Sequence, residues 1–345
     1  MPAIERLGEA SGLAPGWDTA AGSWFRSREF LAYAERFNPC RQRYYQLREG
    51  ERVRAGAIVY SLTLDLLTFL RIPSPITMHL VGIPVGIATP GYFGRPADRD
   101  AVLRDVAARE RGLLVVLNAE AGDHLPVGAR CRMIPTIMMD GRFAGWEAYL
   151  AALRAPHRRR LRKLEESAQR LEAATTGCDR FTEAHHALYR QVHDRAPAKL
   201  ENLSLEFFRN LPPRFALTTY RRDERIVSFT ITVPDGDLLM YFFGGMDYRS
   251  LPDTQAYLVG LAGIVRQAVE RGAPRLDLGQ TADEPKLRFG GALVPKDMYL
   301  CHHRPFVQAL LGRLRPLLEY RGTAPSFHVF RQAGSKAFRD AGGET

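Results

Sequence analysis

The feature that most constrains this chain is an order of predicted elements that occurs twice. In the first half, hydrophobic periodicity predicts a helix, three strands, a helix and a strand, at residues 27–36, 43–48, 53–62, 76–87, 99–111 and 113–117. In the second half the same order returns, at residues 182–193, 215–220, 226–233, 238–243, 254–271 and 275–278. A duplicated order predicts two tandem α/β units, each with a mixed central sheet flanked by helices.

Matching turns and helix ends support the duplication. The polar segments 48–52 and 221–225 each connect two predicted strands. The triplet Glu-Arg-Gly ends both long helices, at Gly112 and at Gly272. Glycine tolerates the left-handed backbone that commonly ends a helix, so we expect both glycines to be helix caps.

The length of the chain fits two units joined by a basic helix. At about 150 residues per domain, 345 residues predict two domains. The hydrophobic fraction of 46% is ordinary for a globular protein and excludes disorder over most of the chain. We place an N-terminal domain at 1–153, a linking helix at 154–175, a C-terminal domain at 176–303, and a C-terminal helix and tail at 304–345.

Cysteine usage and hydropathy indicate a cytoplasmic protein. The four cysteines are far apart and form no Cys-x-x-Cys pair, which argues against a zinc site and a disulfide framework. The first residues lack an apolar core of signal-peptide length, and polar residues interrupt the longest apolar run, residues 58–70. We therefore expect free thiols, a reducing compartment and no membrane insertion.

The excess of cations is concentrated at the start of a helix. The net charge is +10, and residues 154–163 hold six cations around Pro156, which suits a first helical turn. The helix macrodipole disfavours cations there, so phosphates of a coenzyme or of an RNA would offset the cost. A solvated helix start is the alternative. No zinc-finger or RNP-type motif is present, so no DNA partner is expected.

The most informative segment covers residues 238–291. A buried strand runs into Gly244 and Gly245, and a loop follows that contains Asp247 and Tyr248. Ser250 is predicted to cap the next helix. Backbone N–H groups at the start of such a helix can hold a pyrophosphate or a carbonyl oxygen. The glycines suit a close backbone approach to a ligand, or equally a β-bulge.

This segment resembles the GNAT-like acyltransferases of the CelD-like class, and also the Fem-type peptidyltransferases, which hold two GNAT-like halves in one chain. In those families an aspartate-containing strand is followed by a polar loop, a lysine and an aromatic-Gly pair. The matching residues here are Asp277, Gly279, Lys286, Phe289 and Gly290. The likeness is sharp over residues 241–291, and the basic helix fits as well. The resemblance implies an α/β fold of two tandem GNAT-like domains.

The resemblance also implies two possible donors. The common phosphate loop of GNAT enzymes, an Arg/Gln-x-x-Gly-x-Gly/Ala run, is absent here, and Fem-type enzymes take the acyl group from aminoacyl-tRNA. We therefore expect acyl-CoA or aminoacyl-tRNA as co-substrate, no tightly bound cofactor, and a small-molecule amine as acceptor. The leading interpretation is an N-acyltransferase that uses a thioester. Its rivals are a Fem-like transferase that uses aminoacyl-tRNA and a non-catalytic GNAT-like binding protein.

Acyl transfer to an amine requires deprotonation of the amine, stabilisation of the oxyanion and protonation of the leaving group. The chain has no Gly-x-Ser-x-Gly elbow, which favours direct attack over a covalent intermediate. Lys286 is the predicted cation near the oxyanion or a donor phosphate, although a surface lysine is the alternative. Asp277 is a buried base or a structural carboxylate, and Tyr248 a proton donor. Asp283 and Glu284 are alternative bases.

Further residues are predicted to bind the substrates. The donor-binding candidates are glycines, cations and the aromatic-Gly pair, namely Gly244, Gly245, Arg288, Phe289, Gly290, Arg158 and Arg159. The acceptor-binding candidates are His193, Arg195 and Tyr241, the last of which is also a possible proton donor. Neighbouring histidines at 185–186 and 302–303 lack a carboxylate at ligand spacing, so no metal site is expected.

Overall fold

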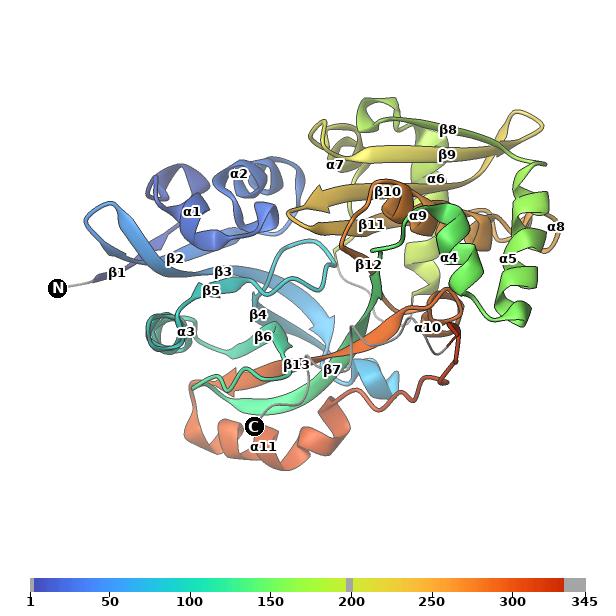
Figure 1. Cartoon of the computed structure of the whole chain (residues 1–345). Coiled ribbons are helices and arrows are strands. Elements are labelled where there is room, and N and C mark those ends of the chain that lie inside the picture. The colour runs from blue at the N-terminus through green and yellow to red at the C-terminus, as the bar shows by residue number, and fades with distance from the viewer. Residues whose placement is uncertain (1–2, 197–200, 332–345) are drawn as a thin grey trace. The chain divides into compact units, whose positions relative to one another are not determined.

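The computed structural model describes residues 3–196 and 201–331 and shows the predicted mixed α/β architecture (Figure 1). The chain divides into two compact units. Unit 1 comprises Met1–Pro135, Ala196–Phe207 and Pro295–Gly322, and unit 2 comprises Thr136–Arg195, Phe208–Val294 and Thr323–Thr345. No helix in the described ranges combines the length and the apolar character needed to cross a bilayer.

The sheet of unit 1 is antiparallel except for one strand pair. Its strands are β1 (Ala3–Leu7), β2 (Gln42–Glu49), β3 (Arg52–Asp65), β4 (Pro75–Val81), β5 (Tyr92–Gly94), β6 (Leu113–Glu120), and the part of β13 (Ala292–His302) from residue 296. β1 to β4 are successive antiparallel neighbours, β5 pairs with β3, β4 and β6 are parallel, and β6 and β13 are antiparallel. Its helices include α1 (Trp17–Ala21), α2 (Arg28–Phe37), α3 (Pro96–Arg109) and α11 (Pro305–Leu318).

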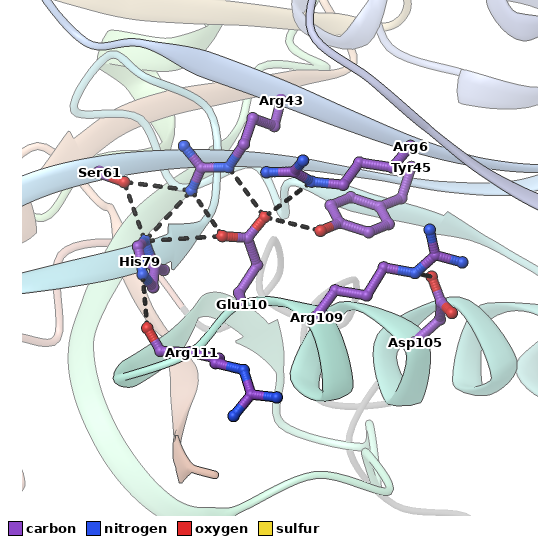
Figure 2. Close-up of polar contacts among 9 residues, drawn as sticks. All are labelled: Arg6, Arg43, Tyr45, Ser61, His79, Asp105, Arg109, Glu110 and Arg111. Carbon is purple, nitrogen blue, oxygen red and sulfur yellow. Dashed lines mark hydrogen bonds and ion pairs between the residues drawn. The ribbon is translucent and has the colours of Figure 1, made fainter.

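A buried carboxylate ties the end of α3 to the sheet of unit 1 (Figure 2). Glu110, which is 5% exposed, accepts hydrogen bonds from Arg43 Nε (2.9 Å) and from the Tyr45 hydroxyl (2.7 Å). The main chain then turns at Gly112, whose φ of 113° is left-handed. Gly272 in unit 2 has a φ of 62°, so the predicted left-handed glycines are confirmed at both helix ends.

His79 completes this network without forming a catalytic triad. Its Nε2 lies 2.9 Å from the carbonyl oxygen of Arg111, which can only accept, so Nε2 carries the proton. Its Nδ1 therefore accepts from the hydroxyl of Ser61 (2.9 Å). In a Ser-His-acid triad the serine and the acid bind opposite ring nitrogens, whereas here Ser61 and Glu110 both approach Nδ1 (Figure 2).

Unit 2 repeats the arrangement of unit 1. Its strands are β8 (Glu172–Gly177), β9 (Ala216–Arg222), β10 (Arg225–Asp235), β11 (Leu238–Met246), β12 (Arg275–Gln280), and the part of β7 (Ala129–Asp140) from residue 136. β8 to β11 are antiparallel neighbours, and β11 and β12 are parallel. The helices are α4 (Trp146–Ala152), α5 (Ala155–Ala168), α6 (Glu183–Arg195), α8 (Leu251–Thr254), α9 (Ala256–Glu270) and α10 (Asp283–Leu287), and α7 (Leu205–Arg209) lies at the unit boundary.

The two units exchange a strand. In each unit's sheet, one strand comes directly after a strand of the other unit in the sequence. β7 comes directly after β6, but its last residues pair with β12 in unit 2. β13 comes after β12, and it pairs with β6 in unit 1. Sequence patterns do not reveal such an exchange, because they report the period of a strand and not its partner.

The helices α6 and α9 cover opposite faces of the sheet in unit 2. Side chains alternate along β10, so Thr232 and Phe229 point to different faces. The Thr232 hydroxyl donates to Gln267 of α9 (3.0 Å), and the ring of Phe229 lies 5.6 Å from that of His185 on α6. Ser250 does not cap a helix as predicted, because its hydroxyl donates to the carbonyl of Asp247 (3.0 Å) before the short helix α8.

Candidate functional site

The two parallel strands of unit 2 separate soon after they meet. β11 and β12 are paired only at Leu238↔Arg275, Leu239↔Leu276 and Met240↔Asp277. Beyond the last pair, β11 continues through residues 241–246, and β12 ends at Gln280. We call this gap in the pairing the β11/β12 opening. Main-chain polar groups along separated strands need other partners. On β12 the carbonyls of Gly279 and Gln280 accept from Lys286, so an extended ligand can bind along β11.

A β-bulge orients the side chains at this opening. The register between β10 and β11 shifts so that Ile231 faces Phe243 while Thr232 faces Tyr241. The extra residue reverses the alternation, so Tyr241 and Gly244 share one face. A Cβ at Gly244 would lie 2.2 Å from the Tyr241 hydroxyl oxygen. Gly244 is therefore the residue that leaves room for this hydroxyl.

Gly245 faces the other side of the sheet. A Cβ there would lie 2.7 Å from the backbone nitrogen of Tyr189 on α6. Both predicted donor-binding glycines thus have a packing reason in the structure, and their contact with a ligand stays a prediction.

Three tyrosines gather around the opening, and we call Tyr241, Tyr248 and Tyr257 the tyrosine cluster. Burial raises the pKa of Tyr241, and the neighbouring Tyr220 and Tyr248 raise it further. Burial likewise raises the pKa of Tyr257, with added effects of Tyr241, Tyr248 and Asp283. Raised pKa values keep the hydroxyls of Tyr241 and Tyr257 protonated, so both can donate hydrogen bonds to a substrate oxygen.

Asp283 brings a carboxylate to this cluster. It is the first residue of α10, and its Oδ1 is buried without a hydrogen-bond partner among the described residues. Buried carboxylate oxygens are almost always hydrogen-bonded, so an unpartnered one indicates a place for a substrate group or a water. The charge of Asp283 acts on both Tyr257 and Lys286.

Lys286 is buried and holds the loop after β12. Its Nζ donates to three successive main-chain carbonyls, those of Gly279 (3.2 Å), Gln280 (2.9 Å) and Thr281 (2.6 Å). An ammonium has three N–H donors, so this loop uses all of them. Burial lowers the pKa of Lys286 to about 8, and the charges of Asp277 and Asp283 oppose that shift. In this conformation Lys286 supports a loop in which Thr281 and Ala282 have left-handed backbone.

Asp277 fixes the turn out of β12. It is 4% exposed, and its Oδ1 accepts from the Thr136 hydroxyl (2.7 Å) and from the backbone N–H of Gly279 (2.7 Å). These contacts correspond to the structural alternative for Asp277, and a role as base stays a prediction.

A pocket of about 410 Å³ lies beside the start of α9, and we call it the α9 pocket. Its lining is largely apolar with two arginines: Arg160, Leu251, Gln255, Tyr257, Leu258, Glu284, Pro285 and Arg288. Arg288 pairs with Glu284 (2.8 Å) and lies 4.3 Å from the ring of Phe327. Burial and the like charge of Arg288 lower the pKa of Arg160, and the charge of Glu284 opposes that shift. An anion between the two arginines would relieve that repulsion.

One residue of the basic start of α5, Arg160, lines this pocket, and the sequence analysis did not name it as a donor-binding candidate. Arg158 donates to the carbonyl of Leu153 (3.2 Å), and Arg159 is exposed. Arg160 lines the α9 pocket. The predicted donor binders Arg158 and Arg159 therefore lie next to the arginine that faces the pocket.

A second pocket, of about 770 Å³, lies between α6 and the β9–β10 hairpin, and we call it the α6 pocket. Its polar lining is mostly cationic: Gln191, Arg195, Arg221, Glu224, Arg225, Asp247 and Arg249. The guanidinium of Arg195 lies 4.3 Å from the ring centre of Tyr248, so this pocket adjoins the tyrosine cluster. His193, two residues before Arg195, is not among the residues that line this pocket, and its Nε2 is buried without a hydrogen-bond partner among the described residues.

The aromatic-Gly pair packs inside unit 2. The carbonyl of Phe289 accepts from the Tyr149 hydroxyl (2.8 Å). Gly290 has a φ of 97°, and a Cβ there would lie 2.4 Å from the ring of Phe330. Both residues shape the chain after α10, and donor binding by them stays a prediction.

The structure thus brings Tyr241, Tyr248, Asp277 and Lys286 to the β11/β12 opening and places Arg288 in the α9 pocket with Tyr257. Sequence reasoning missed Tyr257 and did not single out Arg160. Tyr257 looks like part of an apolar helix face, and its polar surroundings appear only once the chain is folded. Among the described residues, no group of three or more His, Cys, Asp or Glu side chains is arranged to hold a metal ion.

Comparisons with known proteins concern the domain and the fold. Residues 151–287 match the family model of the acetyltransferase (GNAT) domain. The crystal structure of FemX is similar over 89% of this chain and 100% of that chain, with a TM-score of 0.57 and 10% identity. A conserved protein of unknown function from Bacteroides thetaiotaomicron VPI-5482 is similar over 88% of this chain and 100% of that chain, with a TM-score of 0.51 and 12% identity.

No curated protein matches the sequence. The structural likenesses, at 10% and 12% identity, concern the fold alone. The family model confirms the predicted resemblance to GNAT-like acyltransferases, and the likeness to FemX confirms the predicted fold.

Proposed function

We propose that this chain, which carries a GNAT domain in residues 151–287, is an acyltransferase that moves an acyl group from an activated donor to the amine of a small, amino-acid-like acceptor. The observation that carries the proposal is the β11/β12 opening with the tyrosine cluster and the unpartnered Asp283 oxygen beside it. An acyl group between the separated strands would meet an amine at that point.

The α9 pocket suits the donor. Its apolar lining accepts an extended chain, and Arg160 provides a positive charge for a phosphate group, with Arg288 as a second cation that also pairs with Glu284. The first turn of α9 holds no acidic residue, so the positive end of the helix dipole also favours an anion. A thioester of coenzyme A has both parts, an extended arm and phosphates.

The reaction is a direct displacement. The amine nitrogen attacks the acyl carbon, the carbon–sulfur bond breaks, and an amide and a thiol are formed. Asp283 Oδ1 accepts the proton that the amine loses, and the Tyr248 hydroxyl gives a proton to the departing sulfur. Solvent then carries a proton from Asp283 back to Tyr248. The Tyr241 hydroxyl donates a hydrogen bond to the carbonyl oxygen as its negative charge develops.

Lys286 and Asp277 act in this scheme as positioning residues. Lys286 binds the carbonyls of the loop after β12, and Asp277 fixes the turn into that loop. The loop leads directly into α10 and so sets the place of Asp283.

The α6 pocket suits the acceptor. Four arginines line it against two acids, so an acceptor with a carboxylate would be held there while its amine points to Tyr248. Arg195 is the residue that joins the pocket to the reaction centre, because it stacks on Tyr248.

The net charge of +10 favours a second donor, aminoacyl-tRNA, in which the carbon–oxygen bond to the ribose would break instead. A panel of acyl-CoA and charged-tRNA donors with amino-acid-like amines, read by mass spectrometry, tests the proposal. Product formation that ribonuclease abolishes would assign the tRNA donor.

Two substitutions test the assigned roles. We expect Asp283→Asn and Tyr248→Phe each to lower kcat by roughly 100-fold, as for loss of a general acid or base. Asp223→Asn is the matched control, because that side chain is 91% exposed at a hairpin tip. Absence of product from every donor, with no change of melting temperature on adding acyl-CoA or charged tRNA, would favour a binding protein without activity.

A further inference from the structure

The exposed large apolar side chains of unit 1 gather on one surface. On α11, Phe306 is 81% exposed, Leu310 43%, Leu314 38% and Leu317 43%. At 100° per residue these four positions fall within one narrow arc of the helix, which we call the α11 stripe. A continuous apolar stripe in water indicates a surface that has a partner.

The α11 stripe is separate from the side of α11 that packs on unit 1. Leu311 and Leu318 are 6% and 2% exposed and belong to the core beneath the helix. Leu311 and Leu318 therefore anchor the helix, and the four stripe residues are not part of that core cluster.

The loop before β4 extends the same surface. Leu70, Ile72 and Ile76 are 39%, 48% and 39% exposed. This loop is held next to α11, since the rings of Phe69 and Tyr320 are in edge contact at 5.7 Å. The short 3-10 helix of this loop, Thr68–Leu70, also packs against α11. Loop and stripe together form an apolar surface, which we call the α11 surface.

Arginines surround the α11 surface, and the acids there are already engaged. Arg71, Arg304, Arg313 and Arg321 lie on these segments and form no ion pair within residues 3–196 and 201–331. Glu319 is 7% exposed and binds Arg132 and Arg315. Asp65 accepts from the backbone N–H of Ser74 (2.7 Å). The surface is apolar at its centre and cationic at its edge.

We propose that the α11 surface binds the face of an anionic lipid bilayer. The side chains of the stripe enter the boundary between headgroups and acyl chains, and the arginines contact lipid phosphates. Self-association fits less well, because a two-fold interface brings equal patches together and would set arginine against arginine. The chain would lie on the membrane through unit 1, whether or not unit 2 transfers an acyl group.

Vesicle co-sedimentation of the full chain tests the proposal. We expect binding to vesicles of phosphatidylcholine with phosphatidylglycerol, weaker binding to phosphatidylcholine alone, and loss of the difference at high salt. The double variant Phe306→Ser, Leu310→Ser should lower the partition coefficient at least about tenfold, given the apolar area removed. Arg304→Glu with Arg313→Glu should remove the preference for the anionic vesicles.

Two matched controls come from unit 2. Leu293→Ser alters an apolar side chain whose exposure, 37%, is close to the 43% of Leu310, and Arg271→Glu alters an exposed arginine. Both should bind as the unchanged chain does. All variants change exposed side chains, and equal melting temperatures verify that each one folds.

Two results would overturn the proposal. One is an unchanged chain that does not bind the anionic vesicles. The other is a stripe variant that binds them as well as the unchanged chain. A dimer in sedimentation velocity that the stripe variant dissociates, with no vesicle binding, would instead assign the surface to a second copy of the chain.

Discussion

The two units repeat one order of elements but differ at their parallel strand pair. In unit 1, β4 pairs with β6 from Met78↔Leu113 to Val81↔Val116 and ends there. In unit 2, pairing stops at Met240↔Asp277 while β11 continues through residues 241–246. The difference lies in where the first strand of the pair stops. We call unit 1 closed because β4 ends at its last pair, and unit 2 open because β11 continues beyond its own last pair.

The end of the long helix differs in a related way. Both helices lead into the triplet Glu-Arg-Gly. In unit 1, Glu110 is buried and accepts from Arg43 and Tyr45 of β2 (Figure 2). In unit 2, Glu270 is half exposed and pairs only with Arg266, one turn earlier, among the described residues (2.6 Å). The closed unit has its helix bonded to the sheet at this point, whereas the open unit does not.

The largest expected effect is on the stability of unit 1. Glu110→Gln removes a buried charge and leaves Arg43 without its partner, so we expect a loss of about 3 kcal/mol in the free energy of unfolding. Glu270→Gln breaks an exposed pair and should cost less than about 0.5 kcal/mol. Denaturant unfolding at neutral pH measures both. Equal losses would show that the shared triplet has one structural role in both units.

The ion pair of Glu110 with Arg43 should also make the free energy of unfolding depend on pH. Burial alone would raise the pKa of Glu110, but hydrogen bonds from Arg43 and Tyr45 outweigh it and the pKa is lowered from 4.5. A lowered pKa in the folded state means that the stabilisation is present above about pH 4.5 and is lost as the pH falls through the folded value. The difference in the free energy of unfolding between the unchanged chain and Glu110→Gln should therefore shrink below pH 4.5.

A smaller effect is expected at the glycines near the two strand pairs. Gly244→Ala places a methyl group 2.2 Å from the Tyr241 hydroxyl oxygen, so the ring must move. We expect a cost of about 1–3 kcal/mol, as for overpacking, and a loss of any transferase activity that depends on Tyr241. Gly82 follows β4 in unit 1. In Gly82→Ala the added Cβ would make only ordinary van der Waals contacts, the nearest at 3.4 Å. Thermal unfolding of both variants compares them, and equal melting temperatures would contradict the strained contact at Tyr241.

Much of the fold could be predicted because its signals are local. The strand predicted at residues 226–233 is β10, and the helix predicted at 27–36 is α2, whose Ser27 hydroxyl accepts from the Phe30 N–H. Where local signals compete, the prediction was wrong in detail. The strand predicted at residues 76–87 ends at Val81 as β4, because Gly82 and Pro84 follow. The exchange of β7 and β13 has no local signal.

The candidate site also depends on features that have no local signal in the sequence. The sequence indicated Lys286 as a cation in the right loop, but the main-chain carbonyls that it binds depend on left-handed backbone at Thr281 and Ala282. The bulge that turns Tyr241 toward Gly244 depends on the register with β10. Neither is encoded by residue type or spacing, since both arise from pairing between distant segments.

The smallest expected effect concerns the starts of the two matching helices. In unit 1, the first turn of α3 carries Asp98, which pairs with Arg54 (3.0 Å), so its helix dipole already has an acid. In unit 2, the first turn of α9 has none, and Arg160 and Arg288 line the pocket beside it. The open unit therefore has a place for an external anion where the closed unit has its own carboxylate.

Arg160→Ala should raise the KM for a phosphate-containing donor roughly tenfold with little change in kcat, because it removes one charge-assisted contact. Arg159→Ala is the control on the same helix, since that side chain does not line the α9 pocket. Asp98→Asn in unit 1 should leave the KM unchanged. Steady-state kinetics with the donor that the panel identifies would measure all three. A higher KM for Asp98→Asn, or equal values for Arg159→Ala and Arg160→Ala, would show that the anion does not bind at the start of α9.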